Sequence, residues 1–252
     1  MELTVLGAHG TWPGAGGATS GLLVRENDFN IWIDAGSGTV ANLQRHIGLF
    51  DVGAVMISHS HPDHVSDLYS YLMARLFSPE RPPKIPLYLA PNVAERFNPL
   101  LTDDSAEMRL AEAFDIVVVD PGQKLELGPF KMTTAEMRHS VPTFGVRLEA
   151  GGKTLTYSAD TGPTDELVKL GRDADLLVAE ASYQEADGKD LPPIHMSARQ
   201  AGEAAAEAGA GKLVLTHIRP YLDWDRSRDE AAAAFTGETI LGRDNETMKV
   251  GS

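Results

Sequence analysis

Three histidines and an aspartate are crowded into the stretch "HSHPDH" of a chain that has only eight histidines: His59, His61, Asp63 and His64. Imidazole nitrogens and carboxylate oxygens are common ligands of divalent transition metals in proteins. A turn after an apolar strand can direct residues two apart at one centre, so His59 and His61 are expected to bind one cation. Asp63 and His64 are offset and are expected to reach a second cation. Pro62 fixes its own φ angle, which lowers the entropy cost of holding the ligands together.

Four adjacent ligands are too few for two metal ions, so other residues must complete the site. His139, Asp160 and His217 each follow a predicted buried strand, the position where functional residues often lie on a rigid scaffold. A single histidine at a strand end is more often structural than a ligand. Packing alone, however, gives no reason to bury so many titratable groups together, so the cluster favours a metal site with two cations.

The remaining pattern predicts one α/β domain over residues 1–252, because no linker is long and no repeat is seen. Ser197 is the expected N-cap of an alanine-rich helix. Apolar and alternating runs predict strands over 3–8, 20–26, 29–35, 52–58, 114–122, 129–137, 144–150, 154–160, 174–182 and 212–218. Helical spacing predicts helices over 38–48, over 64–77, from Pro163, over 197–210 and around 228–235.

Composition and charge limit the classes of function. The 252 residues are 42% hydrophobic and 23% charged, as in an ordinary soluble protein. No apolar run approaches the roughly 20 residues that span a bilayer, and the N-terminus has no basic segment of a secretory signal, so a cytoplasmic protein without membrane contact is expected. The net charge of −14 repels phosphates at long range, which disfavours a nucleic acid polymer as partner. A small phosphate-bearing substrate is still allowed, since bound metal ions reverse the local field.

The "HSHPDH" stretch fits the H-x-H-x-D-H signature and, with the three later residues in the correct order, resembles the metallo-β-lactamase superfamily. This resemblance implies an αββα sandwich of two mixed β-sheets flanked by helices, with the site at one edge of the sheets. It also implies two divalent metal ions, for which zinc is favoured and manganese or iron are alternatives. The implied ligands are His59, His61 and His139 for the first ion, Asp63, His64 and His217 for the second, and Asp160 as the bridge.

A second resemblance indicates the branch of the superfamily. Branches with a cysteine ligand are excluded because the chain has no cysteine, and diiron flavoproteins usually carry Glu where this chain has His61. The segment "AEASYQEADGKDLPPIHMSARQAGEAAAEAGAGKLVLTHI" is similar to the ribonuclease Z group and its small cyclic-phosphodiesterase relatives. In that group a glutamate and a histidine, here Glu180 and His195, stand beside the metals. His9 and Trp12 lie on a loop that borders the site in this family, whereas His46 is expected to be a solvated surface residue.

The chemistry that the resemblance implies is attack of a metal-bridging hydroxide on the phosphorus of a small, cyclic nucleotide-like phosphodiester. Asp63 would orient the water and accept its proton. His195 would stabilise the developing charge or protonate the leaving alkoxide, and Glu180 would hold the His195 imidazole in position.

Several alternatives stay open. Bacterial ribonuclease Z enzymes carry a long insertion between the third histidine and the bridging aspartate, but only 21 positions separate His139 from Asp160, so processing of tRNA is disfavoured. A thioester, lactone or amide hydrolase would need the same ligands without His195 and Glu180. A metal-binding scaffold without catalysis would not need Asp63, and an amidohydrolase barrel does not fit Asp63 and His64 so close behind the first two histidines. A homodimer is allowed.

Overall fold

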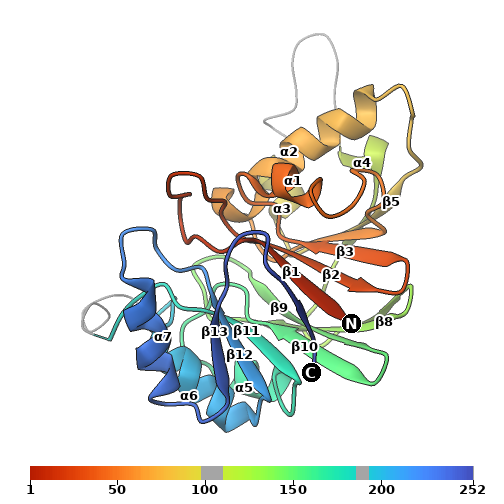
Figure 1. The fold of residues 1–252 in the computed structure, drawn as a ribbon. Helices are drawn as coiled ribbons and strands as arrows, with labels where there is room; N and C mark the ends of the chain where they lie inside the picture. The colour runs from red at the N-terminus through yellow and green to blue at the C-terminus, as the bar shows by residue number, and fades with distance from the viewer. Residues whose placement is uncertain (98–109, 186–192, 252) are drawn as a thin grey trace.

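The computed structural model describes residues 1–97, 110–185 and 193–251, and it contains two seven-stranded β-sheets. The sheets face each other, and helices cover the outer surface of each one (Figure 1). This arrangement confirms the αββα sandwich.

The first sheet is built mainly from the N-terminal half of the chain. β1, β2 and β3 are antiparallel neighbours, whereas β3, β4, β5 and β6 run parallel. A strand near the C-terminus returns to this sheet and pairs with β1. In spatial order the strands are β14 (Thr247–Lys249), β1 (Glu2–Gly7), β2 (Gly21–Glu26), β3 (Phe29–Ile33), β4 (Ala54–Ile57), β5 (Ile85–Leu89) and β6 (Phe114–Val118).

The second sheet is built from the C-terminal half. β7, β8, β9 and β10 form an antiparallel meander, and β10, β11, β12 and β13 are parallel. In spatial order the strands are β13 (Glu238–Leu241), β12 (Lys212–Thr216), β11 (Leu176–Glu180), β10 (Lys153–Tyr157), β9 (Phe144–Ala150), β8 (Phe130–Glu136) and β7 (Lys124–Leu127).

Each sheet has its own set of helices. The first sheet carries α1 (Thr39–Leu43), α2 (Pro62–Phe77), α3 (Val93–Phe97) and α4 (Leu110–Ala113), and the second carries α5 (Asp165–Leu170), α6 (Ala198–Ala208) and α7 (Trp224–Ala232). The alanine-rich face of α6 is buried, and a Cβ on Gly202 would collide with the backbone carbonyl of Ala231. Small residues therefore let α6 and α7 approach closely.

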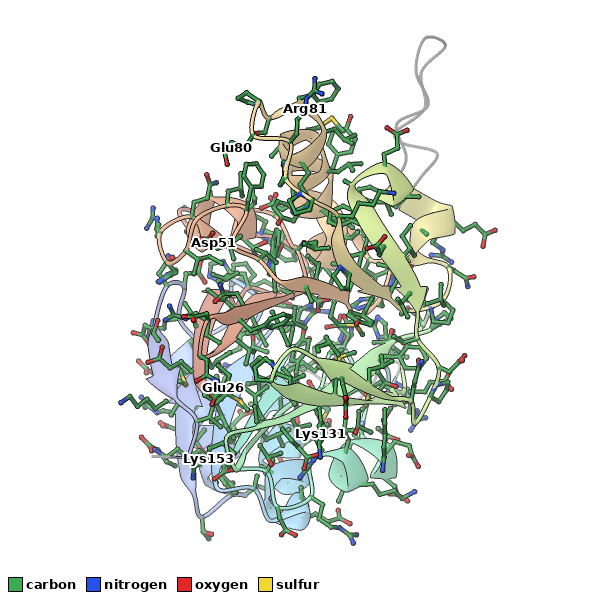
Figure 2. All side chains as sticks on the ribbon, turned by 90° about the vertical axis from the view of Figure 1, so that its right-hand side faces the viewer. Glu26, Asp51, Glu80, Arg81, Lys131 and Lys153 are labelled. Carbon is green, nitrogen blue, oxygen red and sulfur yellow. The ribbon has the colours of Figure 1, made fainter. Side chains whose placement is uncertain are left out.

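The main core fills the space between the sheets. Strands buried on both faces, such as β4, are continuously apolar, and β11 is apolar up to Glu180 at its end, as expected for parallel strands covered on both sides. Phe29 of β3 and Phe130 of β8 join the layers with ring centroids 6.3 Å apart. In Figure 2, charged side chains such as Glu80, Arg81 and Lys131 lie on the outside of the molecule. Within the described ranges, no helix has both the length and the apolar character to cross a bilayer.

The element boundaries differ from the predicted ones at three helices. The helix predicted over 64–77 begins at Pro62, because proline suits the first turn of a helix, where its missing N–H is not needed. The helix predicted over 38–48 is α-helical only over Thr39–Leu43. The last helix begins four residues before 228, where the Asp223 carboxylate accepts from the Arg226 N–H as an N-cap, and it ends at Ala232 rather than 235. The strands β5, β7, β13 and β14 and the short helices α3 and α4 were not predicted.

Candidate metal centre and active site

The candidate site lies where the carboxyl ends of strands from both sheets meet. β3 and β4 are parallel, and β10, β11 and β12 are parallel, so the ends of each group share one edge. Functional side chains follow these ends because the strand fixes the backbone while the loop frees the side chain. The residues at the edge are Asp34 after β3, Ser58 and His59 after β4, Asp160 after β10, Glu180 at the end of β11 and His217 after β12.

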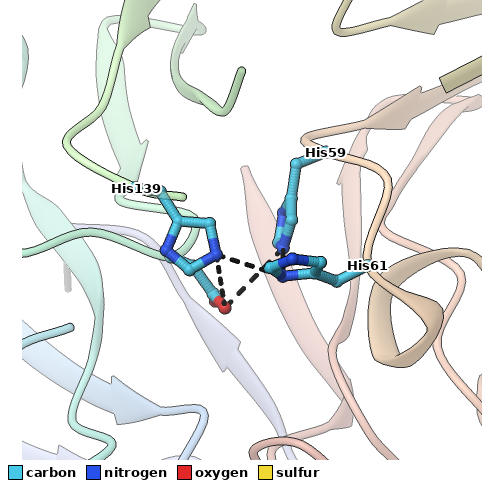
Figure 3. Close-up of side chains that lie close together, drawn as sticks. His59, His61 and His139 are labelled. Atoms are coloured by element: carbon cyan, nitrogen blue, oxygen red, sulfur yellow. Dashed lines mark hydrogen bonds and ion pairs between the residues drawn. The ribbon is translucent and has the colours of Figure 1, made fainter. Parts of the chain in front are cut away.

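The first cluster consists of three imidazoles that converge on one point (Figure 3). His61 Nδ1 lies 3.1 Å from His59 Nε2 and 3.1 Å from His139 Nε2. The Oδ2 atom of Asp160 lies 3.7 Å from His59 Nε2 and 3.9 Å from His139 Nε2. One ligand atom from each of these four residues lies within 4.8 Å of the others, a separation that one cation can bridge.

The second cluster lies beside the first. His217 Nε2 is 3.1 Å from Asp63 Oδ2, and His64 Nε2 is 3.8 Å from the same oxygen. Asp160 joins the clusters, because its Oδ1 lies 3.2 Å from His64 Nε2 and its Oδ2 lies 3.4 Å from His217 Nε2. The structure thus brings together all the predicted ligands and places Asp160 between them. That these residues bind metal stays a prediction.

A buried carboxylate, Asp34, positions two histidines from the first sheet. Its Oδ2 accepts from His64 Nδ1 at 2.8 Å and from the Ser58 hydroxyl at 2.8 Å. Because the Ser58 proton is donated to Asp34, Ser58 Oγ accepts from His59 Nδ1 at 3.0 Å. Tyr157 donates to the same carboxylate at 2.9 Å. Both histidines therefore donate from Nδ1 and direct Nε2 toward the cluster, where its lone pair would bind a cation.

Glu180 performs the same task in the second sheet. Its Oε1 accepts from His195 Nδ1 at 2.9 Å, and its Oε2 accepts from the Ser182 hydroxyl at 2.7 Å. Ser182 Oγ in turn accepts from His217 Nδ1 at 2.8 Å. The backbone N–H of Thr161 also donates to Oε1 at 2.6 Å. Glu180 therefore orients His195 directly and His217 through a serine, and both rings expose Nε2.

Burial and neighbouring charges set the protonation of the site. Burial lowers the pKa of His59, His61 and His139, and these rings are neutral, as metal ligands must be. Burial also opposes the charged form of His64, but the carboxylates around it, Asp160 above all, raise its pKa well above the usual value. Burial would raise the pKa of Asp160, but the histidines around it, chiefly His217 and His64, hold that pKa well below the usual value. Without a cation, the proton on His64 balances the carboxylates, and a bound cation would replace it.

The donor set fits divalent cations. Asp160 Oδ1 is buried and accepts no hydrogen bond of normal geometry, although His64 Nε2 is 3.2 Å away. Buried imidazole lone pairs and a buried carboxylate oxygen without a hydrogen-bond partner cost free energy unless a cation binds them. Nitrogen and oxygen donors of this kind suit zinc, manganese or iron. The side chains of the two clusters thus suit divalent cations, and that they hold two ions stays a prediction.

The backbone is strained at this edge. Asp34 (φ 58°), Ala159 (φ 51°) and His217 (φ 52°) adopt the left-handed conformation although they are not glycines. Such conformations cost about 1–3 kcal/mol each and persist where the surroundings enforce them. This left-handed backbone conformation turns the chain after β3, β10 and β12 so that the side chains there face the site.

Sequence reasoning missed the residues that orient the histidines. Asp34 ends the run "FNIWID" as Asp160 ends "TLTYSAD", so the same signal, an acid after a buried strand, could have found it. Ser58 and Ser182 gave no comparable signal, because a serine beside a histidine or two residues after a glutamate is common.

His9, Trp12 and His46, which the sequence also singled out, lie in different surroundings. His9 packs its ring edge-on against Trp224 at 5.0 Å and accepts from the Gly14 N–H at 2.9 Å, so it supports its loop from within. Trp12 is exposed on the same loop. His46, which was expected to be a solvated surface residue, is partly exposed, and its Nε2 lies 3.1 Å from Asn245 Oδ1. In the segment 179–218, residues 186–192 lie outside the described part.

The comparisons with known proteins agree with this architecture. The sequence profile of the Beta-lactamase superfamily domain matches residues 29–218. The chain therefore belongs to the metallo-β-lactamase superfamily and is a metal-dependent hydrolase. The "Probable metallo-hydrolase YhfI" of Bacillus subtilis is 32% identical and is covered over 97% of its length by 96% of this chain. The crystal structure of YhfI superposes with a TM-score of 0.87 at 30% identity, covering 98% of this chain and 99% of that one.

Two further proteins are similar to this chain, one in sequence and one in fold. A ribonuclease Z from Mycolicibacterium gilvum is 29% identical, with 99% of this chain matching 96% of that enzyme. A diphosphatase from the PhnP family shares the fold, with a TM-score of 0.74 at 17% identity and coverage of 98% and 97%.

Proposed function

We propose that the protein is a phosphodiesterase for small, cyclic nucleotide-like phosphodiesters, with zinc ions held by the two clusters. The observation that supports this reaction over other hydrolyses is the pair of His195 and Glu180. The His195 ring stacks on His217 with centroids 5.6 Å apart, and its Nδ1 lies 3.9 Å from Asp160 Oδ2. A protonated imidazole beside the metal clusters suits a reaction in which negative charge develops on phosphate oxygens and on a leaving alkoxide.

Divalent cations, when bound, supply an activated water and neutralise charge on the phosphate oxygens. The chain's own residues do the rest. Asp63 is placed to orient this water and accept its proton, because its Oδ2 is fixed by the Thr11 N–H at 2.8 Å and lies 3.1 Å from His217 Nε2. Burial would raise the pKa of Asp63, but His64 and His217 hold it below the usual value, so Asp63 stays ionised at neutral pH.

His195 serves as the acid. Burial disfavours its charged form, yet the carboxylate of Glu180 raises the pKa of His195 to about 9. The ring therefore carries a proton on Nε2 at neutral pH and can donate it to the departing oxygen. Glu180 accepts several further hydrogen bonds and is fully buried, so it acts as a rigid support for the imidazole.

The topology of the second sheet and the net charge of the chain favour a small substrate. The residues between His139 and Asp160 consist mainly of the hairpin β9–β10, which pairs from Val146 with Tyr157 to Ala150 with Lys153. This hairpin belongs to the sheet and leaves no protruding arm to hold a folded RNA. With 36 acidic and 22 basic residues, the chain also offers little attraction to a polyanion. The likeness to a ribonuclease Z keeps RNA processing as the competing function.

A substrate panel tests the proposal. Bis-p-nitrophenyl phosphate, 2′,3′- and 3′,5′-cyclic nucleotides, a thioester and a lactone should be assayed with zinc and with manganese. Hydrolysis of the diesters and of neither acyl substrate is expected. Hydrolysis of the thioester or the lactone alone would contradict the proposal and favour an acyl hydrolase.

A further inference from the structure

Two exposed aromatic side chains stack on each other beside the candidate active site. Trp12 is 46% exposed and Tyr221 is 62% exposed, and their ring centroids lie 5.8 Å apart at an interplanar angle of 22°. Trp12 directly follows Thr11, whose N–H donates to Asp63 at 2.8 Å. Tyr221 belongs to the loop that leaves the site after His217. The two rings thus extend from the second cluster toward solvent.

Arg219 connects this aromatic pair to the catalytic histidine. Its guanidinium donates to the Tyr221 hydroxyl at 3.1 Å and to the Tyr183 hydroxyl at 3.3 Å. The guanidinium carbon also lies 4.5 Å from the centroid of the Tyr183 ring. The Tyr183 ring meets His195 edge-on with centroids 5.8 Å apart. A continuous row of planar groups therefore leads from His195 to Trp12.

Arg219 has unused binding capacity. Its Nε atom is buried and has no hydrogen-bond partner. Over residues 1–97, 110–185 and 193–251, no carboxylate forms an ion pair with it within 4.0 Å. Two tyrosines hold the guanidinium in place, and Tyr183 covers one of its faces, so the other face and the charge are available to a ligand.

The loop that carries Trp12 is held from several sides. His9 supports it by accepting from the Gly14 N–H and by packing against Trp224. At the end of the loop, the Ala18 N–H donates to Asp244 at 2.7 Å. A ring presented by such an anchored loop loses little freedom when it binds a ligand, which favours affinity.

We propose that Trp12, Tyr221 and Arg219 form a subsite for a planar aromatic group attached to the substrate's phosphodiester, with a nucleobase as its biological form. The inference rests on the proposed phosphodiesterase function and adds the residues that select among diesters. Aromatic faces stack on any base, and an arginine plane adds a cation–π contribution. A diester with only alkyl groups would leave these residues in water and would gain nothing from them.

A matched pair of substrates tests the subsite in turnover. Thymidine 5′-p-nitrophenyl phosphate and methyl p-nitrophenyl phosphate share their leaving group and differ in the nucleoside. The ratio of their kcat/KM values should favour the nucleoside ester, and Trp12→Ala and Tyr221→Leu should each lower this ratio by roughly tenfold. Phe77→Ala is the control, because Phe77 is 71% exposed at the far end of α2, and it should keep the ratio. An unchanged ratio in both loop variants would overturn the subsite.

Binding without turnover tests the subsite separately from the reaction. Adenosine 5′-monophosphate should quench tryptophan fluorescence and bind at least roughly tenfold more tightly than ribose 5-phosphate, which lacks the base. Trp12→Ala should remove most of the quenching, because Trp32 is fully buried and the third tryptophan, Trp224, is partly buried against His9. Equal affinity for the two phosphates would overturn the subsite. If neither ester is hydrolysed by the wild type but the binding difference is present, the proposed function fails and the subsite stands.

Discussion

Asp34 and Glu180 are buried carboxylates on opposite sheets, and each holds two histidines of the candidate site. Each bonds one histidine directly, and each reaches a second one through a serine hydroxyl. The serine hydroxyl donates its hydrogen bond to the carboxylate, so its oxygen accepts a hydrogen bond from the imidazole Nδ1. These hydrogen bonds hold Nδ1 of each ring as a donor and direct Nε2 toward the site, as a metal-binding lone pair in His59, His64 and His217 and as the proton donor in His195.

His195 should be needed for turnover and not for metal binding. We expect His195→Ala to keep its metal content and fold but to lower phosphodiester turnover by roughly 10²-fold or more, because an acid and a charge stabiliser are lost. Steady-state kinetics, elemental analysis and circular dichroism on one preparation measure the three properties. Full phosphodiesterase activity in this variant would remove the main support for the proposed reaction.

The Glu180 carboxylate should set the alkaline limit of activity. It raises the pKa of His195 to about 9 against the effect of burial, so the protonated acid persists through neutral pH and is lost as the pH rises through that value. In Glu180→Gln the raising charge is absent, and the fall in kcat should therefore move to lower pH. Bound cations affect the pKa of His195 in both the wild type and the variant, so the quantity compared is the difference between their two pH profiles of kcat. Identical alkaline limbs at equal metal content would show that His195 is not the titrating acid.

At the scale of the elements, the site depends on where strands end. The H-x-H-x-D-H pattern and the acid or histidine after each of three apolar runs are local signals, and they pointed to the seven predicted ligands. The αββα sandwich was predicted from the family resemblance that these residues carry. The start of α2 at Pro62 was predicted two residues late, and as a result Asp63 was expected in a turn rather than on the first helical turn. The role of Asp34 depends on the β3–β4 pairing and on Tyr157 from the other sheet, which is a contact that no local pattern shows.

A close approach between two loops should make Gly10 sensitive to substitution. A Cβ on Gly10 would lie 2.5 Å from the His217 carbonyl oxygen and 3.0 Å from its Nδ1. Gly10→Ala should therefore displace His217 and lower both the affinity for the second metal ion and the activity. Gly171→Ala is the matched control, because the atom nearest to its Cβ would be the Leu167 carbonyl oxygen at 3.2 Å, and Gly171 follows α5, away from the site. Isothermal titration with zinc compares the variants, and equal affinities would contradict the assigned role of the loop.

The whole molecule assembles the site from two halves. The first sheet supplies His59, His61, Asp63 and His64, and the second supplies His139, Asp160 and His217. The clusters therefore exist only when the sheets are packed, and bound metal ions should stabilise that packing. The net charge of −14 surrounds this centre with a negative field, so the bound cations would be the strongest positive feature for a phosphate.

Substrate size should follow from that charge distribution. We expect cleavage of small cyclic or activated phosphodiesters with weak dependence on salt, and little 3′ processing of precursor tRNA, because a polyanion needs many cationic contacts. Both substrates can be assayed side by side from 50 to 200 mM salt (about the range over which such contacts lose their strength). Efficient tRNA cleavage that exceeds the small diesters in kcat/KM would contradict this expectation.

The metal content of the protein tests the central claim most directly, since every step above requires that the seven clustered side chains hold cations. Elemental analysis of protein purified without chelator should find about two metal ions per chain, as in other binuclear hydrolase sites. Asp160→Ala should lose both ions together, because one carboxylate lies between the two clusters. A wild-type value near zero, even after zinc or manganese is added, would contradict the account.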